Sequence, residues 1–98
     1  MRKIAIVKKK INTTERLMLY QKNGEIYLFG YDKSEDGSCS WDQFYEEISE
    51  LYDDCADRFG VKIGDWTIIS DPLEGCQHDW IEPTKMTIEN NQVLFNRI

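Results

Sequence analysis

The sequence predicts an α+β fold in which one amphipathic helix covers an antiparallel β-sheet. Three features predict it: short segments rich in β-branched and aromatic residues, asparagine-containing turn signals between such segments, and one central segment whose apolar residues recur at three- and four-residue steps. The expected order along the chain is β-β-β-α-β-β-β. Because 98 residues suffice for one core, we expect a single domain over residues 1–98.

The first three strands form the amino-terminal part of the predicted sheet. β-Branched residues favour a strand over residues 2–8, and a polar turn follows at 11–15. Residues 16–21 and 25–31 flank Asn23-Gly24, the strongest short hairpin signal. These segments are therefore predicted to form strands two and three.

A two-residue turn also fixes the register of this hairpin. Leu19 then lies opposite Leu28, and Tyr20 lies opposite Tyr27 on the other side of the sheet. One face is aliphatic and the other is aromatic, and we expect the aromatic face to be core or a contact between two copies in a homodimer. The aromatic residues are Tyr20, Tyr27, Phe29 and Tyr31.

The central segment predicts a helix that begins at Trp41. Ser40 and Gln43 have the spacing of a capping box, and Gly60 supplies a left-handed end. The helical spacing of the apolar residues gives one stripe for the core. That stripe consists of Trp41, Phe44, Tyr45, Ile48, Leu51, Tyr52, Cys55 and Phe59.

The carboxyl-terminal part predicts one more strand and a closing hairpin. Residues 65–70 read as a strand, Asp71-Pro72 ends it, and a loop extends to Pro83. Residues 84–89 and 92–97 flank Asn90-Asn91 as a hairpin. Its register places four apolar residues on one face: Met86, Ile88, Val93 and Phe95.

The sequence favours a cytoplasmic location. The apolar run after the basic start is too short for a signal peptide, and no apolar stretch approaches the roughly 20 residues that span a bilayer, so we expect a soluble protein. Cys39, Cys55 and Cys76 are odd in number and form no CxxC pair, as expected in a reducing compartment. A single bridge between Cys39 and Cys76 is the alternative.

The charge of −6 is unevenly distributed along the chain. Between Tyr31 and Glu82 we count 15 acidic and 3 basic residues, whereas the flanks hold 9 basic and 3 acidic residues. Such a field attracts basic partners, so we expect a basic protein partner and neither nucleic acid nor membrane. The alternative, nucleic-acid binding by amino-terminal cations and exposed aromatics, has no recognisable motif. Those cations are Arg2, Lys3, Lys8, Lys9 and Lys10.

The loop over 71–83 contains the residues best suited to chemistry, Cys76, His78 and Asp79. In an extended segment Cys76 and His78 would lie about 6–7 Å apart, which does not guarantee a thiol–imidazole pair. Three ligands from one tight loop also fall short of the four in a structural zinc site. We therefore predict no catalytic, cofactor-binding or metal-ligating residue. A small enzyme or a ligand- or metal-binding domain that uses this loop stays as the alternative.

The predicted helix carries many carboxylates opposite its apolar stripe. A solvated surface is the simplest interpretation and a hydrolase or divalent-cation site is another, but Arg58 is the sole basic residue among them. Like charges at i, i+4, such as Asp42/Glu46 and Glu46/Glu50, cost about 0.2–0.5 kcal/mol each. A function in docking on a basic protein would explain that cost. The carboxylates are Asp42, Glu46, Glu47, Glu50, Asp53, Asp54 and Asp57.

The acidic segment Trp41–Phe59 and the loop Asp71-Pro72-Leu73 to Gly75-Cys76-Gln77-His78-Asp79-Trp80-Ile81 give the chain its resemblance to a known class. In size and character it resembles the small acidic bacterial immunity proteins of contact-dependent and polymorphic toxin systems. The resemblance implies a non-catalytic inhibitor that binds a toxin domain, often a nuclease, and blocks it. The carboxylates would steer the partner and Trp80 would contact it. The predicted partner-binding residues are Asp42, Glu46, Glu50, Asp53, Asp57, Glu74, His78, Asp79 and Trp80.

Overall fold

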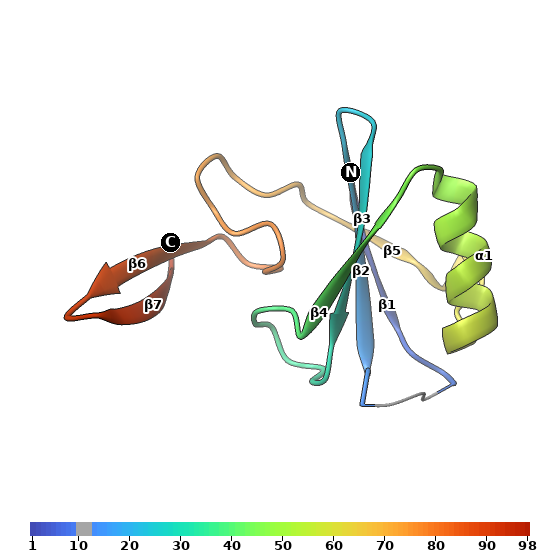
Figure 1. The fold of residues 1–98 in the computed structure, drawn as a ribbon, viewed down its shortest axis with the longest axis horizontal. Coiled ribbons are helices and arrows are strands. Elements are labelled where there is room, and N and C mark those ends of the chain that lie inside the picture. The colour runs from blue at the N-terminus through green and yellow to red at the C-terminus, as the bar shows by residue number, and fades with distance from the viewer. Residues whose placement is uncertain (10–12) are drawn as a thin grey trace.

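A computed structural model describes residues 1–9 and 13–98 and confirms the α+β fold class (Figure 1). Within those residues, five antiparallel strands form one sheet in the order β4-β3-β2-β1-β5, and two further strands form a separate sheet. Residues 10–12, which include Lys10 of the predicted basic group and the start of the predicted turn, lie outside the described residues. The elements are β1 (Arg2–Ile6), β2 (Arg16–Lys22), β3 (Glu25–Tyr31), β4 (Trp41–Tyr45), α1 (Ile48–Phe59), the 3₁₀ helix η1 (Ile63–Asp65), β5 (Thr67–Ile69), β6 (Thr84–Glu89) and β7 (Gln92–Arg97).

The aliphatic face of the sheet forms the main core with α1. β2 and β3 pair in the predicted register, with Leu19 opposite Leu28, and both side chains are fully buried. The helix buries Leu51, Cys55 and Phe59 against this face and ends at Gly60, which has a φ of +67°. The predicted amphipathic helix and its glycine end are therefore confirmed.

The aromatic face forms a second, smaller core. Tyr20 lies opposite Tyr27 as predicted, and Tyr20, Phe29 and Tyr31 are buried with Met18. The expectation that these aromatic residues are core is confirmed for this buried group. Segments outside the sheet cover it, because Cys39 and Ile81 pack against the same cluster.

The prediction that a helix begins at Trp41 is wrong, because residues 41–45 form β4 and the helix begins at Ile48. Trp41 pairs with Gly30, and a Cβ at Gly30 would lie 2.0 Å from the indole ring. The indole nitrogen also donates to the Thr14 hydroxyl over 2.9 Å. The Ser40–Gln43 capping box consequently does not form. The spacing of the apolar residues at 41, 44 and 45 suits a helical turn. The segment nevertheless forms a strand because it pairs with β3 and because the Trp41 ring fits over Gly30.

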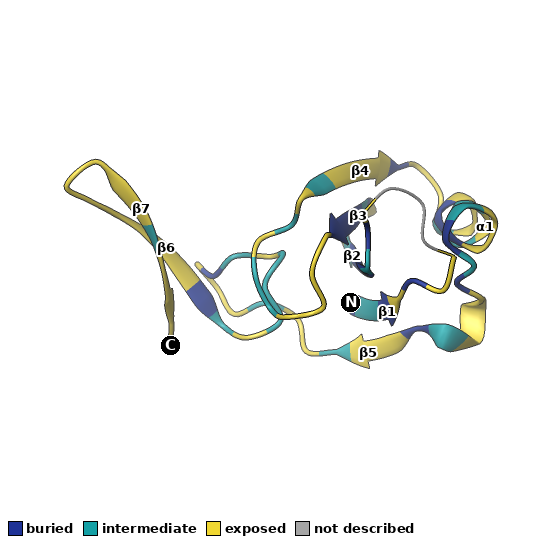
Figure 2. Ribbon diagram, turned by 90° about the horizontal axis from the view of Figure 1, so that it is seen from below, coloured by how far each residue is buried: buried dark blue, intermediate teal, exposed yellow. Residues whose placement is uncertain are grey.

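The closing hairpin forms as predicted but stands apart from the main sheet. Asn90 and Asn91 have φ angles of 51° and 63°, and Met86 lies opposite Phe95. Figure 1 shows β6 and β7 extending away from the five-stranded sheet, and Figure 2 shows both strands largely exposed. The segment between β5 and β6 contains Pro72 and Pro83, which cannot donate to a ladder, and the hairpin emerges beyond it.

Candidate functional site

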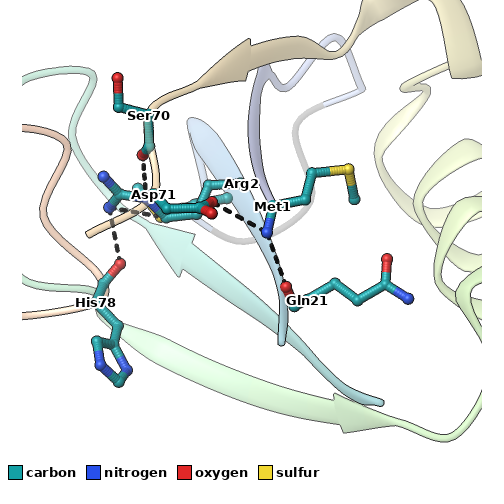
Figure 3. A network of polar contacts seen from close by, with 7 residues as sticks. Met1, Arg2, Gln21, Ser70, Asp71 and His78 are labelled. Carbon is teal, nitrogen blue, oxygen red and sulfur yellow. Dashed lines mark hydrogen bonds and ion pairs between the residues drawn. The ribbon is translucent and has the colours of Figure 1, made fainter. Parts of the chain in front are cut away.

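The loop over residues 70–83 lies on the aromatic face and is held there by a buried arginine. Arg2 is 2% exposed, and its guanidinium donates to the backbone carbonyls of Ser70 (2.7 Å) and His78 (3.0 Å), as Figure 3 shows. It also donates to the carbonyls of Trp80 and Ile81. Burial lowers the pKa of Arg2 from its ordinary value. The interpretation of Arg2 as a surface cation for nucleic acid is therefore wrong, since its donors are used inside the protein.

Two carboxylates join the same loop to residues 32–40. Asp36 accepts hydrogen bonds from the amides of Ile81 (2.8 Å) and Glu82 (2.9 Å). Asp79 accepts one from the Cys39 amide over 2.9 Å. Asp79, which the sequence suggested for partner binding, is thus a group that fixes one loop to another.

The Cys76-His78-Asp79 loop does not assemble a thiol–imidazole pair. Cys76 is 5% exposed, while His78 is exposed with its ring 5.0 Å from the Tyr20 ring. No hydrogen bond joins the Cys76 thiol to His78, and no group of three or more metal-ligating side chains gathers within residues 1–9 and 13–98.

Burial, with the nearby Asp79 carboxylate, raises the pKa of the Cys39 thiol to about 12, which disfavours a thiolate. All three cysteines are free of disulfides.

The predicted acidic residues separate into two groups. Glu50, Asp53 and Asp57 are exposed on α1, and Glu46 and Glu47 are exposed just before it; we call these five residues the acidic surface. Asp42 lies on β4 and pairs with Phe29 across the sheet. The Asp42/Glu46 and Glu46/Glu50 pairs are not helical i, i+4 pairs, so the predicted cost in helix stability is wrong. Asp54 differs because its carboxylate pairs with Arg58 and accepts from Tyr45.

The acidic surface and the 70–83 loop lie on opposite faces of the main sheet. The helix packs on the aliphatic face, whereas the loop covers the aromatic face. Glu74 is exposed in this loop, and Trp80 is partly buried, with its indole nitrogen 3.1 Å from the Ser38 hydroxyl. The predicted partner-binding residues are consequently spread over two surfaces.

The β6–β7 hairpin has an exposed apolar face. The sequence predicted which residues share this face but did not predict that they are exposed. Ile88 is 69% exposed and Val93 is 53% exposed, and they lie directly opposite each other. Phe95 lies 5.3 Å from the ring of Trp80, so the face continues toward the 70–83 loop. Apart from Leu94, which lies opposite Thr87, the other side is polar, and Asn96 donates to Thr87 there. We call the four residues Met86, Ile88, Val93 and Phe95 the hairpin apolar face.

No family model, curated protein or solved structure matches the chain. None of the helices formed by the described residues is long and apolar enough to cross a membrane.

Proposed function

We propose that this chain is a non-catalytic protein-binding domain that contacts a basic protein through the hairpin apolar face. The observation that supports the proposal is a folded hairpin with four large apolar side chains between 41% and 69% exposed. A two-stranded hairpin is at best marginally stable in water. An exposed apolar face on such an element is typical of a surface that a partner covers.

The charge of the chain indicates the kind of partner. The acidic surface holds five exposed carboxylates, and among the described residues none of the five forms an ion pair. Exposed charges of this kind raise the association rate for a partner of opposite sign more than they raise affinity. A basic protein would thus be attracted by the acidic surface and retained by apolar contacts.

The resemblance to bacterial immunity proteins suggests that the basic partner is a toxin and that this chain inhibits it. Such a domain would act in the cytoplasm, bind a cognate toxin and block its active site, with a nuclease as one candidate because nuclease clefts are basic. Burial of the partner's functional surface would achieve the inhibition, and no catalytic group of this chain would be needed.

An affinity capture followed by binding measurements on the purified pair tests the proposal. Wild type is compared with Ile88→Ser/Val93→Ser, with Glu50→Lys/Asp53→Lys/Asp57→Lys, and with a polar-face control, Thr87→Ser/Asn96→Ser. We expect one basic protein that the apolar-face variant binds at least about tenfold more weakly. The charge variant should mainly slow association. Equal affinity of wild type and the apolar-face variant would refute the proposal.

A cavity favours a second candidate, a small-ligand-binding domain. A hollow of about 660 Å³ lies between β5 and the 70–83 loop, lined by Arg2, Leu73, Cys76 and Trp80 among others. That volume is in the range of small-molecule sites. Fragment binding that shifts the amide signals of Leu73 and Cys76 and leaves the hairpin signals unchanged would favour this candidate.

A further inference from the structure

A groove crosses the aromatic face beside β4. Its first part is a hollow of about 240 Å³ lined by tyrosine and phenylalanine rings and by carboxylates. A second hollow of about 390 Å³ adjoins it, since Phe29, Asp42 and His78 line both. We call the combined hollow the aromatic groove. The residues that decide its chemistry are Tyr20, Glu25, Tyr27, Phe29, Asp42 and His78.

Of the tyrosine and phenylalanine rings that line the groove, Tyr27 is partly exposed, whereas Tyr20 and Phe29 are 3% and 9% exposed. Tyr27 and Phe29 lie parallel, with ring centroids 6.3 Å apart and an interplanar angle of 3°. Phe44, which contacts Tyr27 edge-on with ring centroids 5.7 Å apart, is 55% exposed. The face of an aromatic ring carries partial negative charge and attracts a cation within about 6 Å of its centroid.

Two of the three charged residues that line the first hollow are carboxylates, which attract a cation, and the third is Lys22. Asp42 is exposed on β4 opposite Phe29, and the Glu25 carboxylate accepts a hydrogen bond from the Tyr27 hydroxyl over 2.7 Å. Neither carboxylate forms an ion pair with another residue in the described part of the chain. Lys22 is exposed and lies opposite Glu25 in the β2–β3 register, but among the described residues it forms no ion pair with that carboxylate.

We propose that the aromatic groove binds an arginine side chain of the basic protein partner; this inference rests on the proposed function and names one contact within it. A guanidinium is planar and weakly hydrated, so it stacks on aromatic faces and forks to carboxylates in a way that a lysine ammonium does not. The first part of the groove, with a volume of about 240 Å³, suits one long side chain rather than a domain.

The groove and the hairpin apolar face are close enough for one partner to cover both. His78 lines the groove, and Trp80, two residues further along the chain, contacts Phe95 of the hairpin. Two residues span at most about 7 Å of backbone. An arginine that projects from a protein seated on the hairpin apolar face would therefore reach the groove.

A titration of the isolated chain by NMR tests the groove without the unknown partner. The probes are acetyl-Gly-Arg-Gly-amide and its citrulline counterpart, which keeps the shape and loses the charge. We expect saturable shifts of the Tyr27 and Phe44 ring protons with the arginine peptide, and binding at least about fivefold weaker with citrulline. Asp42→Asn should weaken arginine binding about threefold to fivefold, whereas Glu46→Gln, just after β4 on the acidic surface, should leave it unchanged.

Shifts that do not saturate, equal binding of the two peptides, or an unchanged affinity in Asp42→Asn would overturn the inference. The Ile88→Ser/Val93→Ser variant should bind the peptide normally, which separates this test from that of the proposed function. If the arginine peptide binds in the groove but the affinity capture retains no basic protein, the proposed function is wrong. The groove would then bind a free cationic ligand. Partner binding through the hairpin with no peptide binding would refute the groove alone.

Discussion

Arg2→Met is the substitution that should most change the aromatic face. Arg2 is 2% exposed and donates to four carbonyls of the 70–83 loop, from Ser70, His78, Trp80 and Ile81. A buried carbonyl that loses its donor costs about 1–3 kcal/mol, but the loop can open and hydrate some of these groups. We therefore expect a loss of about 3–5 kcal/mol in the free energy of unfolding, a large part of the total for a chain of this size.

Urea unfolding followed by tryptophan fluorescence measures this loss, and amide hydrogen exchange locates it. The amides of Ile81 and Glu82, which donate to Asp36, should exchange much faster in the variant. Lys3→Met is the matched control on the same strand, because Lys3 makes a single hydrogen bond to the Tyr52 hydroxyl and should cost about 1 kcal/mol or less. A loss below about 1 kcal/mol for Arg2→Met, or unchanged exchange in the loop, would refute the role assigned to Arg2.

Three further predictions concern β4, a thiol and a surface carboxylate. Gly30→Ala should lower the free energy of unfolding, measured in urea, by about 1–3 kcal/mol, because the added Cβ would lie 2.0 Å from the Trp41 indole. Gly37→Ala meets no atom within 4 Å and is the control; equal losses would contradict the packing. The Cys39 thiol should react with iodoacetamide at pH ~8 more slowly than a peptide thiol, because burial and Asp79 raise its pKa to about 12, and Asp79→Asn should speed the reaction. A rate unaffected by that change would count against this electrostatic cause. The pKa of Asp65 is lowered, first by a hydrogen bond from a lysine, so its contribution to stability is present above its ordinary pKa and lost as pH falls through the lower folded value. Asp65→Asn should flatten the stability loss below pH ~4, and an acid profile identical to that of wild type would disprove this assignment.

Local signals predicted most of the fold. Asn23-Gly24 and Asn90-Asn91 adopt positive φ angles, so the two hairpins and their registers follow from residues that are adjacent in sequence. The helix prediction for residues 41–45 was wrong because the spacing of their apolar residues suits both a helix and a strand. Gly30, which makes room for the Trp41 ring, lies on a different strand, and no local pattern reveals that pairing.

The candidate site was less predictable because it depends on contacts between distant segments. The buried role of Arg2 requires the 70–83 loop, which is distant in sequence and shows no periodic pattern. The four apolar residues of the closing hairpin were correctly placed on one face, but their exposure depends on where the hairpin sits relative to the sheet. The aromatic groove likewise needs β4 beside β3, a pairing that the predicted helix excluded.

Amide hydrogen exchange of β6 and β7, measured in the free chain and in the complex with the captured basic protein, tests the central claim most directly. We expect the hairpin amides to exchange rapidly in the free chain at every concentration and to become strongly protected in the complex, together with the amides around Trp80. Protection confined to other elements, or a hairpin already protected in the free chain by association with a second copy, would contradict the account.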